Sequence, residues 1–204
     1  PHYLNNVLNT VVYLTAAGKN QDVVKIVHSL IYTLHETLKV GDGNVETTIE
    51  KELELTKCYL DIQRYRYPDV FQVEVKCEEG LKDCLVPKTM IQPLVENAVF
   101  HGLEQKIENG TVWVHVFSPD HATLCFVVED DGCGIEPERL KQILASLEIE
   151  KNTTKIGVFN IYQRLKLYYD DKFSFDIKSS LKKGTCITIS IPRESTAEPE
   201  GSIL

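Results

Sequence analysis

The spacing of apolar residues changes at Pro68, and this change constrains the fold more than any other feature of the sequence. Before Pro68, apolar side chains recur at the three- or four-residue spacing of an amphipathic helix. After it, Phe71–Cys77 alternates apolar and polar residues with a period of two, which indicates a half-buried strand. The sequence therefore predicts a helical part followed by a part that contains a sheet.

The first 66 residues predict amphipathic helices separated by turns. One apolar stripe runs through residues 4–15 and another through residues 23–38, and the segment 17–20 between them predicts a break. Thr47 and Thr48 are good caps for a further helix. The two stripes carry more apolar surface than a lone hairpin can bury, so we expect a helical hairpin that dimerises into a four-helix bundle.

Beyond Pro68, the pattern predicts an α+β sandwich. After the first strand, we expect strands at residues 111–117, 123–128, 173–179 and 185–191, and helices at residues 88–103, 137–147 and 157–169. We divide the chain into a helical domain at 1–67, a sandwich domain at 68–192 and a flexible polar tail at 193–204.

The overall charge excludes some classes of partner. The net charge is −8 at pH 7, so the chain as a whole is not suited to nucleic acid or to an anionic membrane. No apolar run approaches the roughly 18 residues of a membrane span, and the start at Pro1 indicates a fragment of a longer protein. Six scattered cysteines without a CxxC pair are typical of reduced thiols in a cytosolic domain.

One candidate site lies in the segment 92–102, which places Glu96, Asn97 and His101 in an apolar helix. Asn97 and His101 are four residues apart, so a helix puts them on one face. Polar side chains inside a buried helix are costly unless they meet a ligand. The alternative is a capped helix end with a core histidine whose hydrogen bonds are satisfied.

Three further segments are rich in glycine. In the segment 129–135, a strand runs into Asp130, Gly132 and Gly134; a carboxylate there can accept a hydrogen bond from an amine, and glycines let a planar base approach the backbone. Gly157 precedes a helix whose free N–H groups suit phosphates. Gly184 precedes Thr185 at the start of a strand. Taken singly, these segments are also explained by an Asp-Gly turn, an ordinary helix start and a tight turn.

In this order and spacing, the four segments resemble the N, G1, G2 and G3 boxes of the Bergerat ATP-binding fold of gyrase, chaperones, histidine kinases and MutL. The chain as far as Pro192 is similar to the LytS-type sensor histidine kinases. The segments that carry the resemblance are PHYLNNVLN at 1–9, YLDIQRYRY at 59–67, LVENAVFHG at 94–102, EDDGCGI at 129–135 and GTCITISIP at 184–192. The resemblance implies an α+β fold: a helical hairpin, then a mixed sheet with helices packed on one face.

The resemblance also implies a site for ATP and Mg²⁺. Asn97 would ligate the Mg²⁺ that bridges the phosphates, Glu96 would be the catalytic group beside it, and Asp130 would accept the adenine amino hydrogen. The remaining matches are His101 in the N box, Gly132 and Gly134 beside the base, Gly157 near the phosphates, Thr185 at the adenine edge, and residues 136–156 as a mobile lid.

His2 matches the phosphoacceptor histidine of the family, and Asn6 lies one helical turn away. The resemblance thus implies an ATP-dependent histidine kinase that acts as a homodimer. It would pass phosphate to a response regulator, and it would form the cytoplasmic portion of a membrane-anchored protein.

Two departures from the family pattern support an alternative. Phe100 stands where the family usually has a basic residue, and Lys155 stands where the G2 box usually begins with glycine. A pseudokinase scaffold that keeps the fold without binding nucleotide is therefore the second hypothesis. An ATP hydrolase of the gyrase or MutL kind is a third, although such enzymes need further transducer domains.

Overall fold

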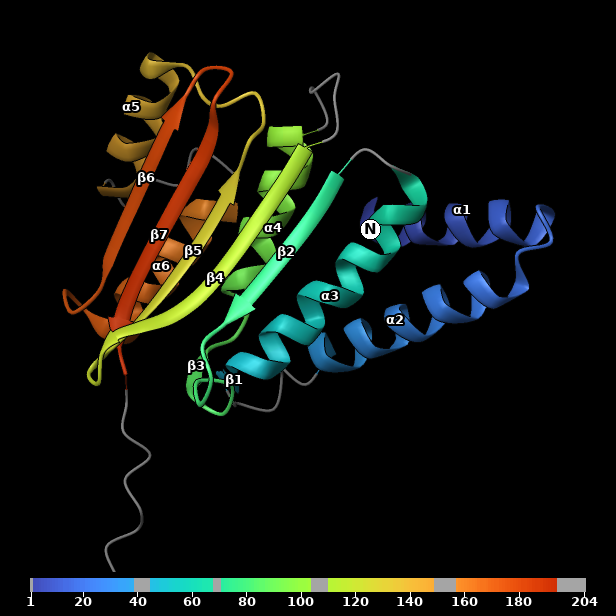
Figure 1. The fold of residues 1–204 in the computed structure, drawn as a ribbon, viewed down its shortest axis with the longest axis horizontal. Coiled ribbons are helices and arrows are strands. Elements are labelled where there is room, and N and C mark those ends of the chain that lie inside the picture. Colours follow the sequence, from blue (N-terminus) through green and yellow to red (C-terminus); the bar gives the residue numbers. More distant parts are fainter. Residues whose placement is uncertain (1, 39–44, 68–70, 104–109, 149–156, 194–204) are drawn as a thin grey trace, which may run out of the picture.

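Three helices make up the N-terminal part of the chain, α1 (His2–Ala16), α2 (Asn20–Leu38) and α3 (Ile49–Arg66). They belong to a computed structural model that describes residues 2–38, 45–67, 71–103, 110–148 and 157–193. Figure 1 shows α1 and α2 as a pair that extends away from the sheet, with α3 between this pair and the sandwich. None of the described helices is both long and apolar enough to cross a lipid bilayer.

The predicted break after α1 is confirmed, and Gly18 makes it. Gly18 adopts a φ of 71°, the left-handed conformation that favours glycine after a helix end. The N–H of Lys19 donates to the Leu14 carbonyl at 2.9 Å, and the N–H of Gly18 donates to the Thr15 carbonyl at 3.1 Å. This pair of bonds is a Schellman motif, so α1 stops here and α2 folds back against it.

The predicted cap of α3 is also confirmed, since the Thr48 hydroxyl accepts a hydrogen bond from the N–H of Lys51 at 3.3 Å. The residues that precede the cap were not predicted to be a strand. β1 (Glu46–Thr48) pairs antiparallel with β3 (Leu85–Pro87), so the start of α3 is tied to the segment just before the N-box helix.

The main sheet has five strands in the order β2-β4-β5-β7-β6. Its strands are β2 (Phe71–Cys77), β4 (Gly110–Asp120), β5 (Thr123–Asp130), β6 (Ser174–Ser180) and β7 (Gly184–Pro192). β2 runs parallel to β4, whereas the other neighbours are antiparallel, so the sheet is mixed. The α+β fold class with a mixed sheet is therefore confirmed.

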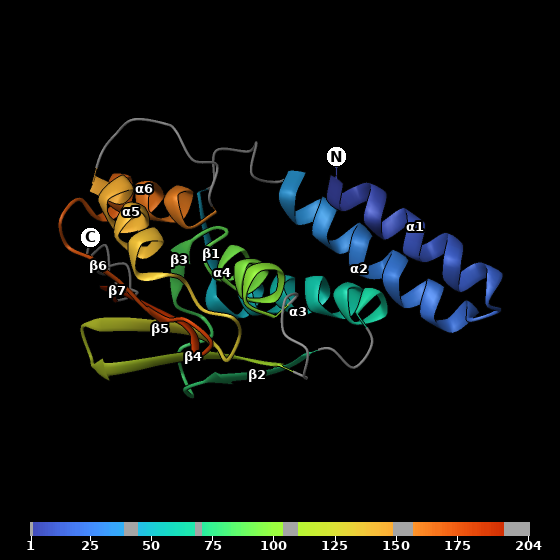
Figure 2. The same ribbon diagram turned by 90° about the horizontal axis from the view of Figure 1, so that it is seen from above.

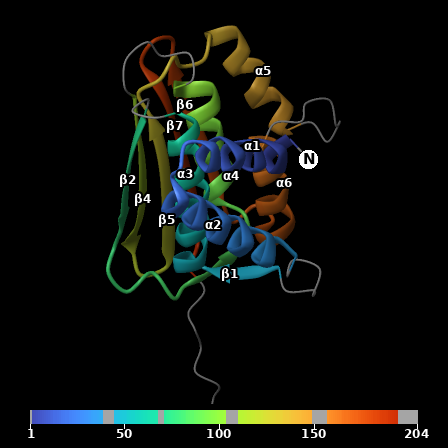
Figure 3. The ribbon, with the colours of Figure 1, turned by 90° about the vertical axis from the view of Figure 1, so that its right-hand side faces the viewer.

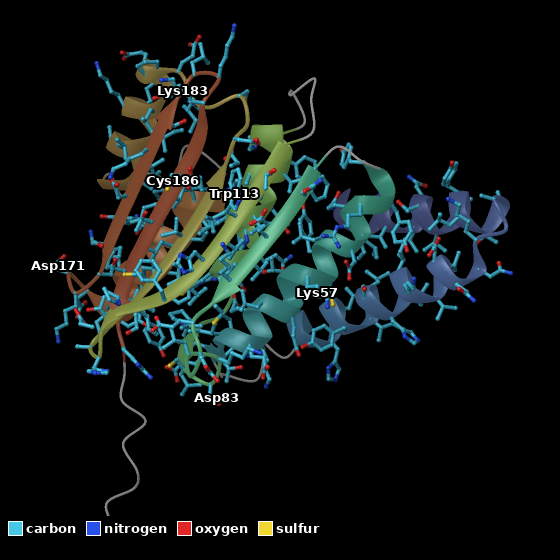
Figure 4. All side chains as sticks on the ribbon, viewed as in Figure 1. Lys57, Asp83, Trp113, Asp171, Lys183 and Cys186 are labelled. Carbon is cyan, nitrogen blue, oxygen red and sulfur yellow. The ribbon has the colours of Figure 1, made fainter. Side chains whose placement is uncertain are left out.

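The sheet is covered by helices on one face, as Figures 2 and 3 show. The covering elements are α4 (Ile91–Asn97), the π-helical segment η2 (Ala98–Leu103), α5 (Pro137–Glu148) and α6 (Gly157–Tyr169). Alternate residues of β4, such as Val112 and Val114, are buried beneath them. The opposite face carries Trp113 and Cys186 and has no helix over it in Figure 4.

The helix predicted at residues 88–103 is shorter and less regular than expected. It begins at Ile91, and after Asn97 it changes from α-helical to π-helical geometry. Pro93 is accommodated because it lies in the first turn, where a backbone N–H has no partner within the helix.

α3 belongs to two hydrophobic cores at once. Its Ile62 is fully buried among Val7, Leu14, Ile26 and Leu30 of the hairpin. Its residues Ile49, Tyr59 and Leu60 lie instead in the large core beneath the sheet. α3 is therefore the physical connection between the helical hairpin and the sandwich.

Candidate functional site

A cavity of about 440 Å³ lies between the sheet and its covering helices. Its walls come from α4, η2, α5, α6 and the strands β5, β6 and β7. Of the residues predicted from the sequence, the cavity brings together Asn97, His101, Asp130, Gly134 and Thr185. Most of the other lining residues are apolar: Leu94, Ala98, Val128, Ile135, Ile143, Val158, Ile177 and Ile187.

Asp130 is the buried charge of the cavity. It is the last residue of β5, and only 5% of it is exposed. Its Oδ1 accepts a hydrogen bond from the N–H of Gly132 at 2.8 Å. Burial raises the pKa of this carboxyl to about 6, although the backbone hydrogen bonds from Gly132 and Thr185 act in the opposite direction. Near neutral pH the group is a carboxylate in an apolar pocket, where an external N–H donor would be strongly favoured.

The glycines around Asp130 allow the backbone to close tightly on it. A Cβ on Gly102 would lie 2.5 Å from Oδ1 of Asp130, and a Cβ on Gly132 would overlap the Gly102 carbonyl. The N–H of Cys133 donates to that same carbonyl at 2.8 Å. Gly132 therefore packs the loop after β5 against η2 and is not among the cavity-lining residues, whereas Gly134 lines the cavity as predicted.

Asn97 also lines the cavity and carries an unsatisfied polar atom. Its Nδ2 is buried and has no hydrogen-bond partner among the described residues. A Cβ on Gly157 would lie 3.4 Å from this nitrogen, so the start of α6 is brought directly against Asn97. Because buried polar atoms without partners are rare and costly, Asn97 has the environment expected of a ligand-binding residue.

Glu96 points elsewhere. It is half-buried, it accepts a hydrogen bond from Nε2 of Gln92 at 2.9 Å, and it is not among the residues that line the cavity. Burial raises the pKa of its carboxyl, which the hydrogen bond from Gln92 opposes. Glu96 is therefore adjacent in sequence to Asn97 but lies on a different side of α4.

Thr185 lies at the wall formed by β6 and β7. Its hydroxyl is 3.0 Å from the Ser179 hydroxyl, and Ser179 Oγ also accepts a hydrogen bond from the N–H of Ile135 at 2.8 Å. These bonds connect the last two strands of the sheet to the loop that follows Asp130. Ser179 was not singled out from the sequence, because a serine in a polar strand carries no distinguishing pattern.

Sequence reasoning also missed Arg139, a residue of α5 that lines the cavity. It is the one cationic side chain among the described lining residues.

Of the predicted lid, Pro137–Glu148 forms α5, while residues 149–156, including Lys155, lie outside the described part. Phe100 lies on η2 and does not line the cavity. His2 is the first residue of α1, and its side chain and that of Asn6 are outside the described set.

The comparisons with known proteins agree with this geometry. Residues 1–71 match the family model described as histidine kinase, and residues 83–195, more than half of the chain, match the model described as histidine kinase-, DNA gyrase B-, and HSP90-like ATPase. The chain therefore belongs to this ATPase family, and its N-terminal part is that of a histidine kinase. The resemblance drawn from the motifs is confirmed, and ATP is the ligand that this type of domain uses.

Two curated relatives are similar over nearly the whole chain. The sensor protein LytS of Bacillus cereus is 33% identical over 98% of this chain and 33% of its own length. The sensor histidine kinase YesM of Bacillus subtilis is 29% identical over 94% of this chain and 31% of its own length. The chain thus spans about a third of the length of these relatives.

A solved structure shows the same fold. The histidine kinase domain of the Erythrobacter litoralis EL346 blue-light activated histidine kinase has a TM-score of 0.53 and 17% sequence identity. The match covers 88% of this chain and 83% of that domain.

The buried carboxyl of Asp130 predicts a pH-dependent difference in stability. Its pKa rises from 3.8 to about 6 on folding, so it destabilises the folded state increasingly as pH rises through this interval. An asparagine at this position does not ionise, so Asp130→Asn avoids this destabilisation. We expect the free energy of unfolding of the variant, relative to that of the unsubstituted protein, to increase by on the order of 2 kcal/mol as the pH rises from 4 to 7. Urea denaturation at several pH values measures this difference.

The matched control is Glu129→Gln, which changes the exposed neighbouring carboxylate. It should shift the unfolding free energy by less than about 0.5 kcal/mol at every pH. A gain from Asp130→Asn that does not change with pH would contradict the assigned cause.

Proposed function

We propose that this chain is the ATP-binding and phosphoacceptor portion of a sensor histidine kinase that transfers phosphate from ATP to its own histidine. The observation that carries the proposal is that one cavity is lined both by a buried carboxylate, Asp130, and by Asn97, whose buried amide nitrogen has no hydrogen-bond partner among the described residues. The first suits an amine of a base, and the second suits a metal-bound phosphate.

The cavity fits a nucleotide in three respects. Its apolar walls suit a planar base, and the Asp130 carboxylate can accept a hydrogen bond from the exocyclic amine of adenine. The start of α6 at Gly157 presents backbone N–H groups beside Asn97, where the phosphates would lie. Arg139 of α5 would add a positive charge to the wall of the cavity. These features favour a kinase over a scaffold that does not bind nucleotide.

The residues also fit Mg²⁺ held mainly by the nucleotide. The described residues contain no group of three His, Cys, Asp or Glu side chains that could hold a metal alone. Asn97 would contribute one amide oxygen, and phosphate oxygens and water would complete the coordination. When bound, Mg²⁺ would offset negative charge on the transferring phosphate.

His2 would accept the phosphate. A neutral ring nitrogen of His2 would form a bond to the γ-phosphorus while the bond from that phosphorus to the bridging oxygen breaks, so ADP leaves. Glu96, whose pKa is raised by burial, would accept or share the proton of the attacking ring. Its place outside the cavity lining supports a role toward the histidine rather than toward the nucleotide.

The same proposal includes a homodimer. Exposed apolar residues follow helical spacing on the hairpin: Leu4, Leu8 and Val12 on α1, and Val24, Ile31 and Leu34 on α2. They are additional to the buried residues of the hairpin core, so a second hairpin would cover them.

The phosphate on His2 would then pass to an aspartate of a response regulator. The chain would be the cytoplasmic portion of a membrane-anchored protein.

Nucleotide binding is tested by Asp130→Asn. We expect calorimetry to show that the folded chain binds ATP with Mg²⁺ and that the variant loses about 10- to 100-fold in affinity, because a charge-assisted hydrogen bond is worth about 1.5–3 kcal/mol. Asp176→Asn, an exposed carboxylate of β6, is the control and should bind normally. Equal affinity of the Asp130 variant and the unsubstituted protein would show that Asp130 does not bind the adenine amino group.

The metal role of Asn97 predicts a selective loss. Asn97→Ala should weaken binding of ATP measured with Mg²⁺ more than binding measured with a chelator, because only the first uses the amide oxygen as a ligand. Asn160→Ala, an exposed asparagine of α6, is the matched control. If Asn97→Ala weakens both by the same factor, Asn97 is a structural residue.

The dimer predicts a mass of two chains in light scattering. Val12→Asp, at a residue that is 68% exposed on α1, should give the mass of one chain because it would place a charge in the apolar contact. Leu167→Asp, at a residue of α6 that is 87% exposed, should leave the mass unchanged. A single-chain mass of the unsubstituted protein at high concentration would count against the dimer.

The phosphoacceptor is tested in a longer version of the protein that includes residues before Pro1. His2→Gln should abolish acid-labile phosphorylation by labelled ATP while ATP binding is kept, and Glu96→Gln should slow phosphorylation with binding largely kept. His28→Gln, an exposed histidine of α2, should be phosphorylated normally. Acid-labile phosphate on the His2 variant would place the acceptor elsewhere.

A further inference from the structure

A second buried carboxylate lies outside the cavity. Glu52 of α3 is 1% exposed. Its Oε1 accepts a hydrogen bond from the N–H of Thr89 at 2.6 Å, and its Oε2 accepts hydrogen bonds from the N–H groups of Met90 at 2.8 Å and Ile91 at 3.0 Å. Burial raises the pKa of this carboxyl, and the three backbone bonds oppose the rise. One side chain of α3 thus satisfies three consecutive donors at the start of α4.

The Glu52 carboxylate takes the place of an N-cap side chain at the start of α4. The residue in the capping position, Met90, makes no side-chain hydrogen bond to the helix. The first N–H groups of a helix need acceptors, and a negative charge near them is favourable. Thr89 just before has a φ of 63°, a left-handed conformation that is unfavourable for a β-branched residue. The Glu52 bonds hold the turn in this conformation.

Arg164 of α6 holds the same turn from the other side. Its Nη1 donates to the carbonyl of Lys88 and to the carbonyl of Thr89, the latter at 3.0 Å. α6 begins at Gly157, where an added Cβ would lie 3.4 Å from Nδ2 of Asn97. The turn at residues 88–91 therefore connects α3, α4 and α6, the last two of which meet at Asn97.

We infer that Glu52 is a positioning residue: by fixing the start of α4 on α3, it sets where Asn97 lies and so assembles the phosphate and metal end of the nucleotide site. α4 has only seven residues, so a shift at Ile91 reaches Asn97 over about 9 Å of rigid helix. Asp130 lies on β5, whose position is set by its pairing with β4 and β7, so we expect the adenine end to depend much less on Glu52 than Asn97 does. The inference rests on the proposed nucleotide site.

The contact between Glu52 and α4 also couples the position of the helical hairpin to the nucleotide site. The Tyr32 hydroxyl of α2 donates to Glu54 of α3 at 2.7 Å, and the Tyr65 hydroxyl of α3 donates to Asp22 of α2 at 2.9 Å. α3 is thereby attached to the hairpin by polar bonds as well as by Ile62. A displacement of the hairpin that moves α3 would move the Glu52 carboxylate away from α4.

The test compares two ligands on the full chain. In Glu52→Gln, an amide group replaces one acceptor oxygen and faces backbone donors, so at least one bond is lost. We expect affinity for ADP with Mg²⁺ to fall on the order of 10-fold, while affinity for adenosine, which has no phosphate, changes less than about 2-fold. Glu50→Gln, an exposed carboxylate of α3, is the control and should leave both affinities unchanged.

Arg164→Gln is a second, independent test. It removes the hydrogen bonds from α6 to the carbonyl groups of Lys88 and Thr89, so affinity for ADP with Mg²⁺ should again fall while affinity for adenosine is kept. It decides the question if Glu52→Gln does not fold, as judged by circular dichroism and a cooperative thermal transition. Equal loss of both ligands, or loss of neither, in the folded variants overturns the inference. If Asp130→Asn does not weaken the binding of adenosine, the proposed nucleotide site itself is wrong. This outcome is distinct from a failure of the positioning role of Glu52 alone.

Discussion

The site depends on a carboxylate held in an apolar pocket at the end of β5. Asp130 is almost completely buried, and within the described chain its contacts are backbone N–H groups and closely packed glycines rather than a cation. A buried charge without a counter-ion destabilises the fold, as the raised pKa of Asp130 reflects. An N–H donor of a bound ligand would offset part of this cost. Glycine is required at two neighbouring positions, because a side chain at Gly102 would collide with the Asp130 carboxylate and one at Gly132 would collide with the backbone of Gly102.

A second constraint is that α4 is too short and too poorly capped to position Asn97 by itself. It receives its cap from Glu52 of α3, and it continues into π-helical geometry that brings His101 and Gly102 to the cavity. Segments of π-helix are frequent at functional sites, where they redirect side chains. The start of α4 is thus held by polar contacts from α3 and α6, whereas the sheet beneath is held by alternating apolar residues.

Much of the architecture could be predicted from local sequence patterns. The period-two strands, the break at Gly18 and the Thr48 cap each depend on a few neighbouring residues, so they appear in the structure where expected. The ordered motifs predicted a nucleotide site of seven residues. Five of them, Asn97, His101, Asp130, Gly134 and Thr185, line one cavity, whereas Gly132 and Gly157 are not among its lining residues. The strands β1 and β3 were missed because three residues are too few to show a period. Glu52 was missed because its partners lie 37 to 39 residues away, and a buried glutamate in a helix looks like a surface one in sequence. The π-helical segment was not predicted, because the apolar spacing of residues 98–103 continues that of the α-helix before it.

The measurement that tests this account most directly is the calorimetric comparison of ATP and GTP with Mg²⁺ on the folded chain. Adenine carries an amino group at the position where guanine carries a carbonyl oxygen, so with the base in the same orientation only ATP presents an N–H donor to the Asp130 carboxylate at that position. The account predicts that ATP binds and that GTP binds at least about 10-fold more weakly, because a carbonyl oxygen would face a buried carboxylate. Equal affinity for the two nucleotides, or no binding of ATP, would contradict it.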